Sequence, residues 1–355
     1  MGLAEKITAC YFYQDMRIIF VTGGAGFIGS AFVRLILSEI EDVKIVNFDA
    51  LTYAGNLENL EGIDSSRHEF IHADITDRKA VLEALPEGAD AIFNFAAESH
   101  VDRSILSADA FLKTNVIGTQ VLLDAARHKK VRRFVQISTD EVMGSLPEDE
   151  SSFFTEDSPL KPNSPYAASK AAAELIVRAA NKTFGVDTVI TRCGNNYGPR
   201  QFPEKLIPLM IINAINDEPL PVYGDGRNVR DWIYVDDHCR AIWEIYLKGK
   251  SGEVYNIGAR NEKQNIEVVK SILDILGKSH SLIKFVEDRP GHDRRYAIDP
   301  TKVENEIGWK PRMSWEQGLK ETIKWYIDNP GWIERVRDGS YRDYYLQNYG
   351  ARLGI

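Results

Sequence analysis

Short apolar runs alternate with amphipathic stretches through the first half of the chain. Arg17–Val21 is an apolar run that ends at a glycine cluster, and Val43–Phe48 is a second run that ends at Asp49. Between them, Phe27–Ile40 repeats apolar positions at the spacing of a helix. Further strands are expected at Glu69–His72, Ala91–Phe95, Phe134–Ile137 and Thr188–Thr191. This alternation predicts an α/β fold built on a doubly wound parallel sheet of the Rossmann type.

The pattern changes after about residue 193, where proline and glycine become frequent and the elements shorten. Only 227–234 and Val254–Ile257 are typical of strands there, whereas 108–128 and 166–183 earlier in the chain predict long helices. The sequence leaves open whether a tyrosine-rich tail (Tyr341, Tyr344, Tyr345 and Tyr349) docks or frays. We expect an extension at 1–15, a Rossmann domain at 16–192, a smaller mixed α/β C-terminal domain at 193–337 with segments returning to the first domain at about 229–262, and a tail at 338–355.

Composition and charge exclude several classes of function. The 355 residues carry a net charge of −9, which argues against binding to nucleic acid. No apolar run approaches the ~20 residues of a membrane helix, so no membrane association is expected. Cys10, Cys193 and Cys239 lack any paired spacing, which favours free thiols in a reducing cytoplasm. His100 and His292 are isolated in the sequence, so no metal site is expected.

A glycine-rich turn follows the first predicted strand. Gly23, Gly26 and Gly29 would let pyrophosphate approach backbone N–H groups at the start of a helix. Asp49, about 20 residues further on, can accept hydrogen bonds from ribose hydroxyls and would repel a 2′-phosphate. Together they predict NAD rather than NADP as the cofactor.

Two further groups near this turn have alternative explanations. Asp74 and Ile75 follow the third strand, where an adenine would lie, but Asp74 could equally cap a helix over 77–85. Phe95, Ala96 and Ala97 close the fourth strand with small residues that could pass beneath a cofactor or simply fill the core.

The chemistry is indicated by Tyr166 and Lys170, which are spaced i, i+4 and so share one helix face. An ammonium beside a phenol lowers the phenol's pKa from ~10 and makes it a usable base. Thr139 is followed by Asp140 and Glu141. Two adjacent carboxyl groups in a closed site repel as anions, so one is pushed toward its acid form. An acid and a base beside a redox pair suggest that oxidation is coupled to elimination of water.

These motifs resemble those of the extended short-chain dehydrogenase/reductases that act on nucleotide sugars, and within them the dTDP-glucose 4,6-dehydratases. The resemblance extends from Met16 to about Trp332 and depends on seven segments: Phe48–Asn56, Ala96–Ser104, Thr139–Val142, Tyr166–Lys170, Asn195–Pro199, Pro203–Pro208 and Asp288–Tyr296. Met143, Ala167 and Gly194 depart from the residues that the family usually has.

The resemblance implies that the chain is a hydro-lyase that converts dTDP-glucose to dTDP-4-keto-6-deoxyglucose for deoxysugar biosynthesis. Tyr166 would take the proton from the hydroxyl on carbon 4 while NAD accepts the hydride. Glu141 would then remove the proton on carbon 5, and protonated Asp140 would donate to the hydroxyl that leaves carbon 6, where the hydride returns. Thr139 would hydrogen-bond the carbon 4 oxygen, and Lys170 would also hold the nicotinamide ribose.

The resemblance also implies two sets of binding residues and a homodimer paired through the long alanine-rich helices, although packing within one chain would explain those helices equally well. The cofactor set is Gly23, Gly26, Phe27, Ile28, Gly29, Asp49, Ala50, Leu51, Thr52, Asp74, Ile75, Phe95, Ala96, Ala97, Ser99, Thr114, Tyr166, Lys170 and Asn196. The substrate set is Ser99, Thr139, Asn195, Lys205, Leu206, Pro221, Tyr223, Arg230, Asn265, Arg289, His292 and Tyr296, with Tyr223 near the thymine.

Two other functions are alternatives to this one. A nucleotide-sugar 4-epimerase shares the glycine turn and the Tyr166/Lys170 pair, but it has no use for the acid and base at Asp140 and Glu141. A catalytically inactive NAD-binding scaffold would need none of these residues. The sequence does not decide between thymidine and uridine, because one methyl group is worth only ~1–3 kcal/mol.

Overall fold

The computed structural model describes residues 16–148, 152–337, 341, 343 and 345–353. The predicted extension at 1–15 and Tyr344 therefore lie outside the described residues. None of the helices within these ranges is long and apolar enough to cross a membrane.

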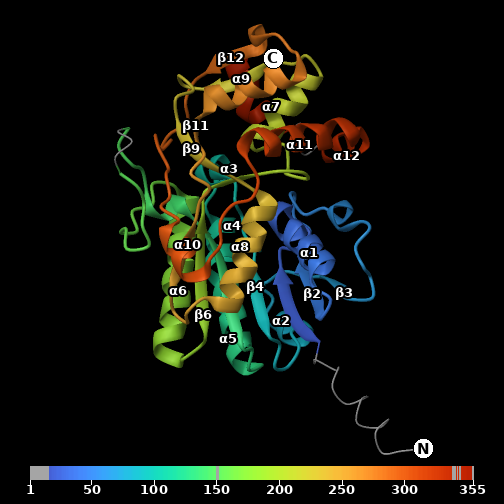
Figure 1. The fold of residues 1–355 in the computed structure, drawn as a ribbon, viewed down its shortest axis with the longest axis vertical. Coiled ribbons are helices and arrows are strands. Elements are labelled where there is room, and N and C mark those ends of the chain that lie inside the picture. Colours follow the sequence, from blue (N-terminus) through green and yellow to red (C-terminus); the bar gives the residue numbers. More distant parts are fainter. Residues whose placement is uncertain (1–15, 149–151, 338–340, 342, 344, 354–355) are drawn as a thin grey trace, which may run out of the picture.

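A seven-stranded parallel sheet forms the larger part of the molecule (Figure 1). In spatial order its strands are β10 (Val254–Ile257), β6 (Thr188–Cys193), β5 (Arg133–Thr139), β4 (Ala91–Asn94), β1 (Arg17–Thr22), β2 (Val43–Asp49) and β3 (His68–His72). The strand order reverses between β1 and β4, and ligands of doubly wound sheets bind at the carboxyl ends of strands at such a point. The predicted doubly wound α/β fold is confirmed.

Helices cover both faces of the sheet because alternate residues of each strand face opposite ways. On β1, Ile19 and Val21 belong to the core under α1 (Phe27–Glu39) and α8 (Val235–Lys248). Phe20 faces the opposite core, under α2 (Arg78–Ala84), α5 (Thr119–His128) and α6 (Pro165–Phe184). All three side chains are fully buried. The continuous apolar run at Arg17–Val21 is therefore explained by a strand buried on both faces.

The second half of the chain builds a smaller region above the sheet, at the top of Figure 1. Its strands form a three-stranded sheet of β11 (Glu262–Gln264), β9 (Val229–Tyr234) and β7 (Asn195–Tyr197), and a two-stranded sheet of β12 (Ile283–Val286) and β8 (Leu220–Tyr223). An apolar cluster joins these strands to α7 (Leu206–Ile215), α9 (Asn265–Leu276), α11 (Trp315–Asp328) and α12 (Pro330–Val336). From this half, β10 joins the large sheet as its edge strand and α8 packs on that sheet, while α10 (Thr301–Ile307) lies beside both.

The helix expected over 108–128 is not continuous α-helix. It consists of α4 (Asp109–Phe111), a π-helical segment η3 (Leu112–Gly118) and then α5. Within η3, the Asn115 amide accepts from the Glu98 N–H at 2.9 Å and donates to the Ser169 hydroxyl at 2.8 Å. These are contacts with distant segments, so the local helical pattern could not reveal the wider turn.

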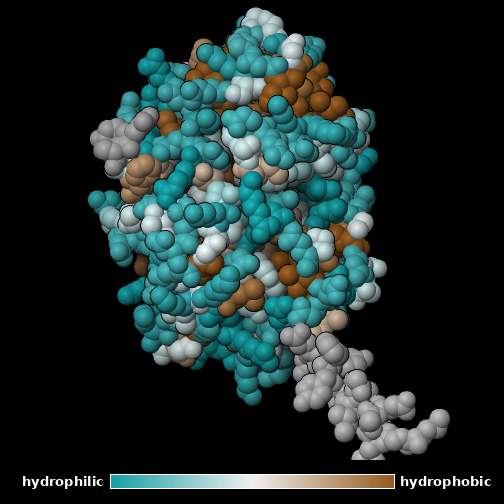
Figure 2. Space-filling view, in the orientation of Figure 1, coloured by the Kyte–Doolittle hydropathy of each residue, from teal (hydrophilic) through white to brown (hydrophobic). Residues whose placement is uncertain are grey.

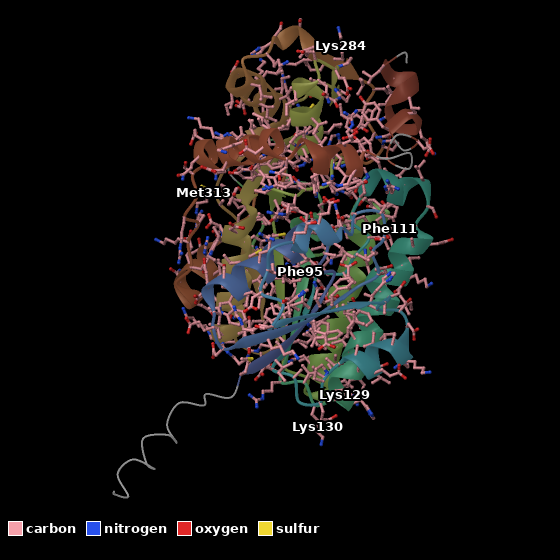
Figure 3. All side chains as sticks on the ribbon, turned by 90° about the vertical axis from the view of Figure 1, so that its right-hand side faces the viewer. Phe95, Phe111, Lys129, Lys130, Lys284 and Met313 are labelled. Atoms are coloured by element: carbon pink, nitrogen blue, oxygen red, sulfur yellow. The ribbon has the colours of Figure 1, made fainter. Side chains whose placement is uncertain are left out.

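Polar side chains cover most of the face seen in Figure 2, and apolar ones form separate patches. Figure 3 places Lys129 and Lys130 at the base of the large sheet and Lys284 at the opposite end of the molecule. Phe95, directly after β4, lies between these ends.

Candidate active site

The glycine turn between β1 and α1 is closed as tightly as its sequence suggests. Gly23 has a φ of +70°, and a Cβ atom there would lie 2.6 Å from the backbone nitrogen of Ala96. A Cβ atom on Gly29 would lie 2.2 Å from the carbonyl oxygen of Gly23. Gly26 precedes α1, and no side chain caps that helix end. Its first N–H groups therefore remain available to an anionic ligand in the adjoining cavity.

Asp49 ends β2 and lines the same cavity. Its carboxylate accepts from the Ala25 N–H at 2.8 Å and from the Leu51 N–H at 2.7 Å, one bond to each oxygen. Burial raises the pKa of Asp49. Each oxygen keeps a second lone pair for a ligand hydroxyl. Leu51 itself does not line the cavity, because its side chain packs against the core.

The structure decides whether Asp74 caps a helix or lines the cofactor cavity. Helix α2 is capped by Asp77, whose carboxylate accepts from the backbone N–H groups of Lys79 and Ala80 at 3.0 and 3.1 Å. Asp74 and Ile75 instead line the cavity. The helix-cap explanation therefore applies to Asp77 and not to Asp74.

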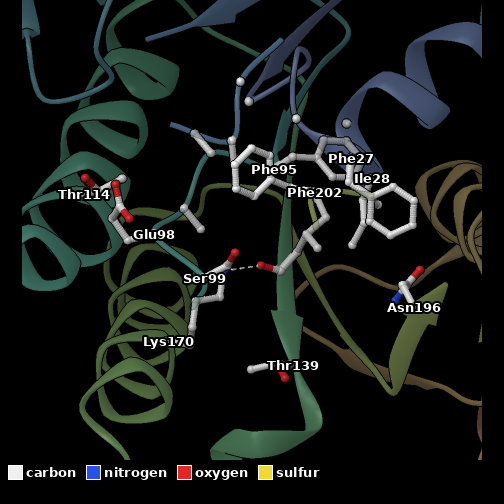
Figure 4. A pocket seen from close by; sticks show the side chains of 18 of the residues that line it. Phe27, Ile28, Phe95, Glu98, Ser99, Thr114, Thr139, Lys170, Asn196 and Phe202 are labelled. Atoms are coloured by element: carbon white, nitrogen blue, oxygen red, sulfur yellow. Dashed lines mark hydrogen bonds between the residues drawn. The ribbon is translucent and has the colours of Figure 1, made fainter. Parts of the chain in front are cut away.

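The five predicted catalytic residues line one cavity with the glycine turn. Thr139 is the last residue of strand β5, and the following 3-10 turn, η4 (Asp140–Met143), contains the carboxyl groups of Asp140 and Glu141. Helix α6 carries Tyr166 and Lys170, and it begins where the Ser164 hydroxyl accepts from the Ala167 N–H at 3.1 Å. Figure 4 shows Lys170 and Thr139 facing the cavity on the side opposite Phe95.

The two neighbouring carboxyl groups have different surroundings. Oδ1 of Asp140 accepts from the Thr139 hydroxyl at 3.2 Å, whereas its Oδ2 is buried and has no hydrogen-bond partner among the described residues. Burial first, and then the charge of Glu141, raises the pKa of Asp140 well above its usual range. Burial also raises the pKa of Glu141. Three positive charges oppose that rise, those of Arg289, Lys205 and Arg230.

The Tyr166 phenol is not activated by Lys170 in the way the sequence suggested. The Lys170 ammonium donates to the Ile137 carbonyl at 2.6 Å, and burial lowers its pKa to about 8. The pKa of Tyr166 is raised well above its usual range, by burial and then by the charge of Glu141. A hydrogen bond with Thr139 acts in the opposite direction. The expected lowering of the phenol pKa is therefore wrong, because burial and the charge of Glu141 raise it.

The predicted substrate residues fall into two groups. Four of them line the cavity: Ser99, Thr139, Asn195 and Lys205. Eight lie outside it, in the smaller region: Leu206, Pro221, Tyr223, Arg230, Asn265, Arg289, His292 and Tyr296. Of the second group, Arg289 and Arg230 still lie close enough to act on Glu141. Nη1 of Arg289 is buried and lacks a hydrogen-bond partner among the described residues, which suits an anionic ligand.

Comparison with known proteins agrees with this geometry. The family model described as GDP-mannose 4,6 dehydratase matches residues 20–322. A dTDP-glucose 4,6-dehydratase from Shigella flexneri is 50% identical, over 94% of this chain and 99% of its own length. A relative of the same name from Neisseria meningitidis is 50% identical, over 92% and 98%. The chain belongs to the dTDP-glucose 4,6-dehydratase family.

Solved structures of this family have the same fold. The dTDP-glucose 4,6-dehydratase of Streptomyces venezuelae, solved with NAD and TYD bound, has a TM-score of 0.87 and 49% identity, and the match covers 90% of this chain and 99% of that one. A UDP-glucose 4-epimerase from Thermus thermophilus, solved with NAD, has a TM-score of 0.80 at 29% identity, covering 87% and 99%. Dehydratases and epimerases thus share the architecture, and the site residues must separate them.

Several residues of the cavity were not predicted from the sequence, among them Glu98, Gln201, Phe202 and Glu204. Glu204 joins three segments of this dehydratase-family site. One of its oxygens accepts from the Tyr53 hydroxyl at 2.9 Å and the other from Nε of Arg103 at 3.0 Å. Glu204 lies inside the matched segment Pro203–Pro208, so that segment was the available signal, but its partners are more than 100 residues away in the sequence.

Proposed function

We propose that this chain is a dTDP-glucose 4,6-dehydratase, which converts dTDP-glucose to dTDP-4-keto-6-deoxyglucose and water in deoxysugar biosynthesis. One observation carries the proposal. A neighbouring acid and base, Asp140 and Glu141, line the same cavity as the Tyr166/Lys170 pair and the glycine turn. Oxidation alone requires only one proton acceptor, whereas elimination requires both an acid and a base.

NAD is the proposed cofactor, and bound NAD supplies the acceptor and later the donor of hydride. The residues present fit it. The uncapped start of α1 beside Gly26 suits the pyrophosphate, and the Asp49 carboxylate suits ribose hydroxyls. Asp74 and Ile75 would face the adenine. The negative charge of the Asp49 carboxylate disfavours the 2′-phosphate of NADP.

Tyr166 is the proposed acceptor of the carbon 4 hydroxyl proton. Only the phenolate form of Tyr166 can take this proton, and the hydrogen bond with Thr139 favours that form, because it lowers the phenol pKa against the rise caused by burial and by Glu141. The Lys170 ammonium, fixed to the Ile137 carbonyl, keeps a positive charge on the same helix face. Loss of the hydroxyl proton and of a hydride turns carbon 4 into a ketone, which acidifies the proton on carbon 5.

The two carboxyl groups then divide the elimination between them. Glu141 takes the carbon 5 proton, and Asp140, kept protonated by burial and by the charge of Glu141, donates to the hydroxyl leaving carbon 6. Water departs and a double bond forms between carbons 5 and 6. Return of hydride to carbon 6 and of a proton to carbon 5 completes the reaction without net oxidation.

The reaction is tested by incubating the protein with dTDP-glucose and measuring the alkali-induced ultraviolet absorbance of a 4-keto sugar. An epimerase would give dTDP-galactose instead, and a scaffold would leave the sugar unchanged. Rates with UDP-glucose in parallel decide the preferred base. Thymidine is the proposed preference, in keeping with the TYD bound to the Streptomyces venezuelae relative.

The role of Glu141 is tested by Glu141→Gln. The variant should still reduce the bound nicotinamide on addition of dTDP-glucose, but it should release no 4-keto-6-deoxy product. Glu87→Gln is the matched control, because that side chain is 62% exposed and should leave turnover unchanged. Normal turnover by Glu141→Gln would remove Glu141 from the mechanism.

We also propose that the chain works as a homodimer in the cytoplasm. Ile117 on η3 and Leu175 on α6 are 55% and 57% exposed, on two segments that pack side by side. Such apolar side chains on adjacent helices suit pairing with a second copy. Light scattering should give a dimer, and Leu175→Glu should give a monomer.

The proposed cytoplasmic location is supported by the cysteines. The thiols of Cys193 and Cys239 are buried and free, as in a reducing compartment.

A further inference from the structure

The C-terminal tail, whose docking the sequence left open, lies against the substrate side of the active site. Tyr341 is only 3% exposed, and its ring packs edge-on against Phe202 at 6.0 Å between centroids. Phe202 lines the catalytic cavity. The Tyr341 hydroxyl also donates to the carbonyl of Pro203 at 3.4 Å. Tyr341 of the tail therefore packs against the loop that contains Phe202 and Pro203 and leads to Lys205.

Further along, the tail reaches Tyr223 on β8. The π-helical segment η6 (Leu346–Gly350) provides Asn348, whose amide donates to the Tyr223 oxygen at 3.0 Å. The short helix α14 (Ala351–Leu353) provides Arg352, whose Nη1 donates to the same oxygen at 2.9 Å. The Arg352 guanidinium also lies 5.1 Å from the centre of the Tyr223 ring, and the Tyr349 ring is stacked on it at 5.9 Å.

These contacts fix the orientation of the Tyr223 hydroxyl. Asn348 and Arg352 donate to its oxygen, and the hydroxyl itself donates to Asp102 at 3.0 Å. Asn348 donates to the same Asp102 oxygen at 3.3 Å. Tyr349 also makes a side-chain hydrogen bond with Tyr223. Three residues near the end of the chain therefore help to orient Tyr223.

Asp102 links Tyr223 to Arg289, on the side of the catalytic cavity. Its other oxygen lies 3.5 Å from Nε of Arg289. Arg289 leaves Nη1 buried without a partner among the described residues, and its charge reaches Glu141. A continuous set of contacts thus runs from the tail through Tyr223 and Asp102 to a cation that is poised for an anionic ligand.

We propose that Arg352 and Asn348 are positioning residues that hold Tyr223 and Asp102 for the nucleoside diphosphate end of the substrate. The proposal rests on the proposed function, because it takes a nucleoside diphosphate as the ligand. Both residues lie beyond all the matched motifs.

The test is Arg352→Ala in the full-length chain, with dTDP as the probe in calorimetry and dTDP-glucose in steady-state kinetics. Loss of a charged hydrogen bond is worth about tenfold in affinity, so the Kd for dTDP and the KM for dTDP-glucose should each rise about tenfold. The kcat value and the NAD content should stay within about twofold of wild type. Ile327→Ala, on α11 and 52% exposed, is the control and should change none of them.

Two further variants separate positioning from general support of the fold. Arg352→Lys keeps a cationic donor and should recover part of the lost affinity. In a Tyr223→Phe background, which lacks the shared hydroxyl, Arg352→Ala should cost much less than in wild type. Equal costs in the two backgrounds, or a fall in kcat with KM unchanged, would overturn the proposal.

Failure of the inference is distinguishable from failure of the proposed function. If wild type forms no 4-keto sugar, the proposed function is wrong. If wild type is active and Arg352→Ala binds dTDP as tightly as wild type does, the inference about the tail is wrong and the dehydratase assignment stands.

Discussion

Asp140→Asn should abolish most activity while removing a pH-dependent loss of stability. Asp140 is 2% exposed, and its Oδ2 has no hydrogen-bond partner among the described residues. Burial and the charge of Glu141 raise the pKa of Asp140 in the folded protein well above its usual range. Asparagine has the same shape and keeps the oxygen that accepts from Thr139, but it cannot ionise or donate a proton as an acid.

The sign of the stability effect follows from linkage between protonation and folding. In the unfolded chain Asp140 loses its proton near pH ~3.9, whereas in the folded chain it keeps that proton to a higher pH. The folded state therefore loses about 1.4 kcal/mol of stability for each pH unit above the unfolded value, until the folded pKa is reached. The loss is absent in Asp140→Asn.

The assay is thermal unfolding of wild type and Asp140→Asn at pH 5, 6 and 7. The wild-type Tm should fall relative to that of the variant at each step up in pH over which Asp140 stays protonated in the folded protein. The asparagine amide is itself unpaired, but that cost is the same at every pH and cancels in the comparison. Removing a general acid should also lower kcat by about 10²–10⁴-fold. Parallel Tm curves for the two proteins would refute the claim that Asp140 is held as an acid, and exposed Asp157→Asn serves as the control.

Three further predictions concern the cofactor and the proton carriers. Gly29→Ala places a Cβ atom 2.2 Å from the Gly23 carbonyl oxygen, so the purified variant should lose its NAD. The NAD content is measured by absorbance of the denatured extract, and retained NAD would contradict the tight turn. The pKa of about 8 for Lys170 predicts an alkaline limb near pH 8 in the rate profile, which Lys170→Arg should move to higher pH; an unmoved limb would assign it to another group. Phosphate groups of a bound substrate neutralise the cations around Glu141 and so raise its pKa. The acidic limb of kcat should therefore lie at higher pH than that of kcat/KM. Coincident limbs would place those cations away from the phosphates.

The parallel sheet could be predicted because its central strands are buried on both faces and appear as apolar runs. Arg17–Val21 is a clear case, since it coincides with strand β1 except for the final Thr22. The break in the helix over 108–128 could not be predicted in this way. It accompanies hydrogen bonds from Asn115 to Glu98 and Ser169, which no local pattern contains.

The site was predictable where a short segment carries its own chemistry. The glycine turn, Asp49 and the Tyr166/Lys170 pair are of this kind, and all line the cavity. Glu204 is different, because its importance lies in partners contributed by distant segments. The same holds for Arg352, whose contact with Tyr223 joins the end of the chain to β8. Such residues show no signal until the fold brings them together.

The departures from the family pattern show how the structure tolerates variation near the site. Met143 is buried outside the cavity, where its sulfur accepts from the Arg192 guanidinium at 3.5 Å. At Gly194 a Cβ atom would lie 2.7 Å from the carbonyl oxygen of Asp231, so this backbone has no room for a side chain. Neither position donates or accepts a proton in the proposed reaction.

Asp140 and Glu141 are adjacent in sequence, yet the structure can give them opposite roles because their surroundings differ. The positive charges of Arg289, Lys205 and Arg230 all stabilise the ionised form of Glu141, whereas for Asp140 the opposing cation is Arg230 and the charges of Glu141 and Asp231 add to the rise. In the proposed reaction the acid is therefore defined by burial and by neighbouring anions, and the base by cations. Since those cations belong to the predicted substrate side, the residues that would hold the diphosphate also determine which carboxyl group is the base.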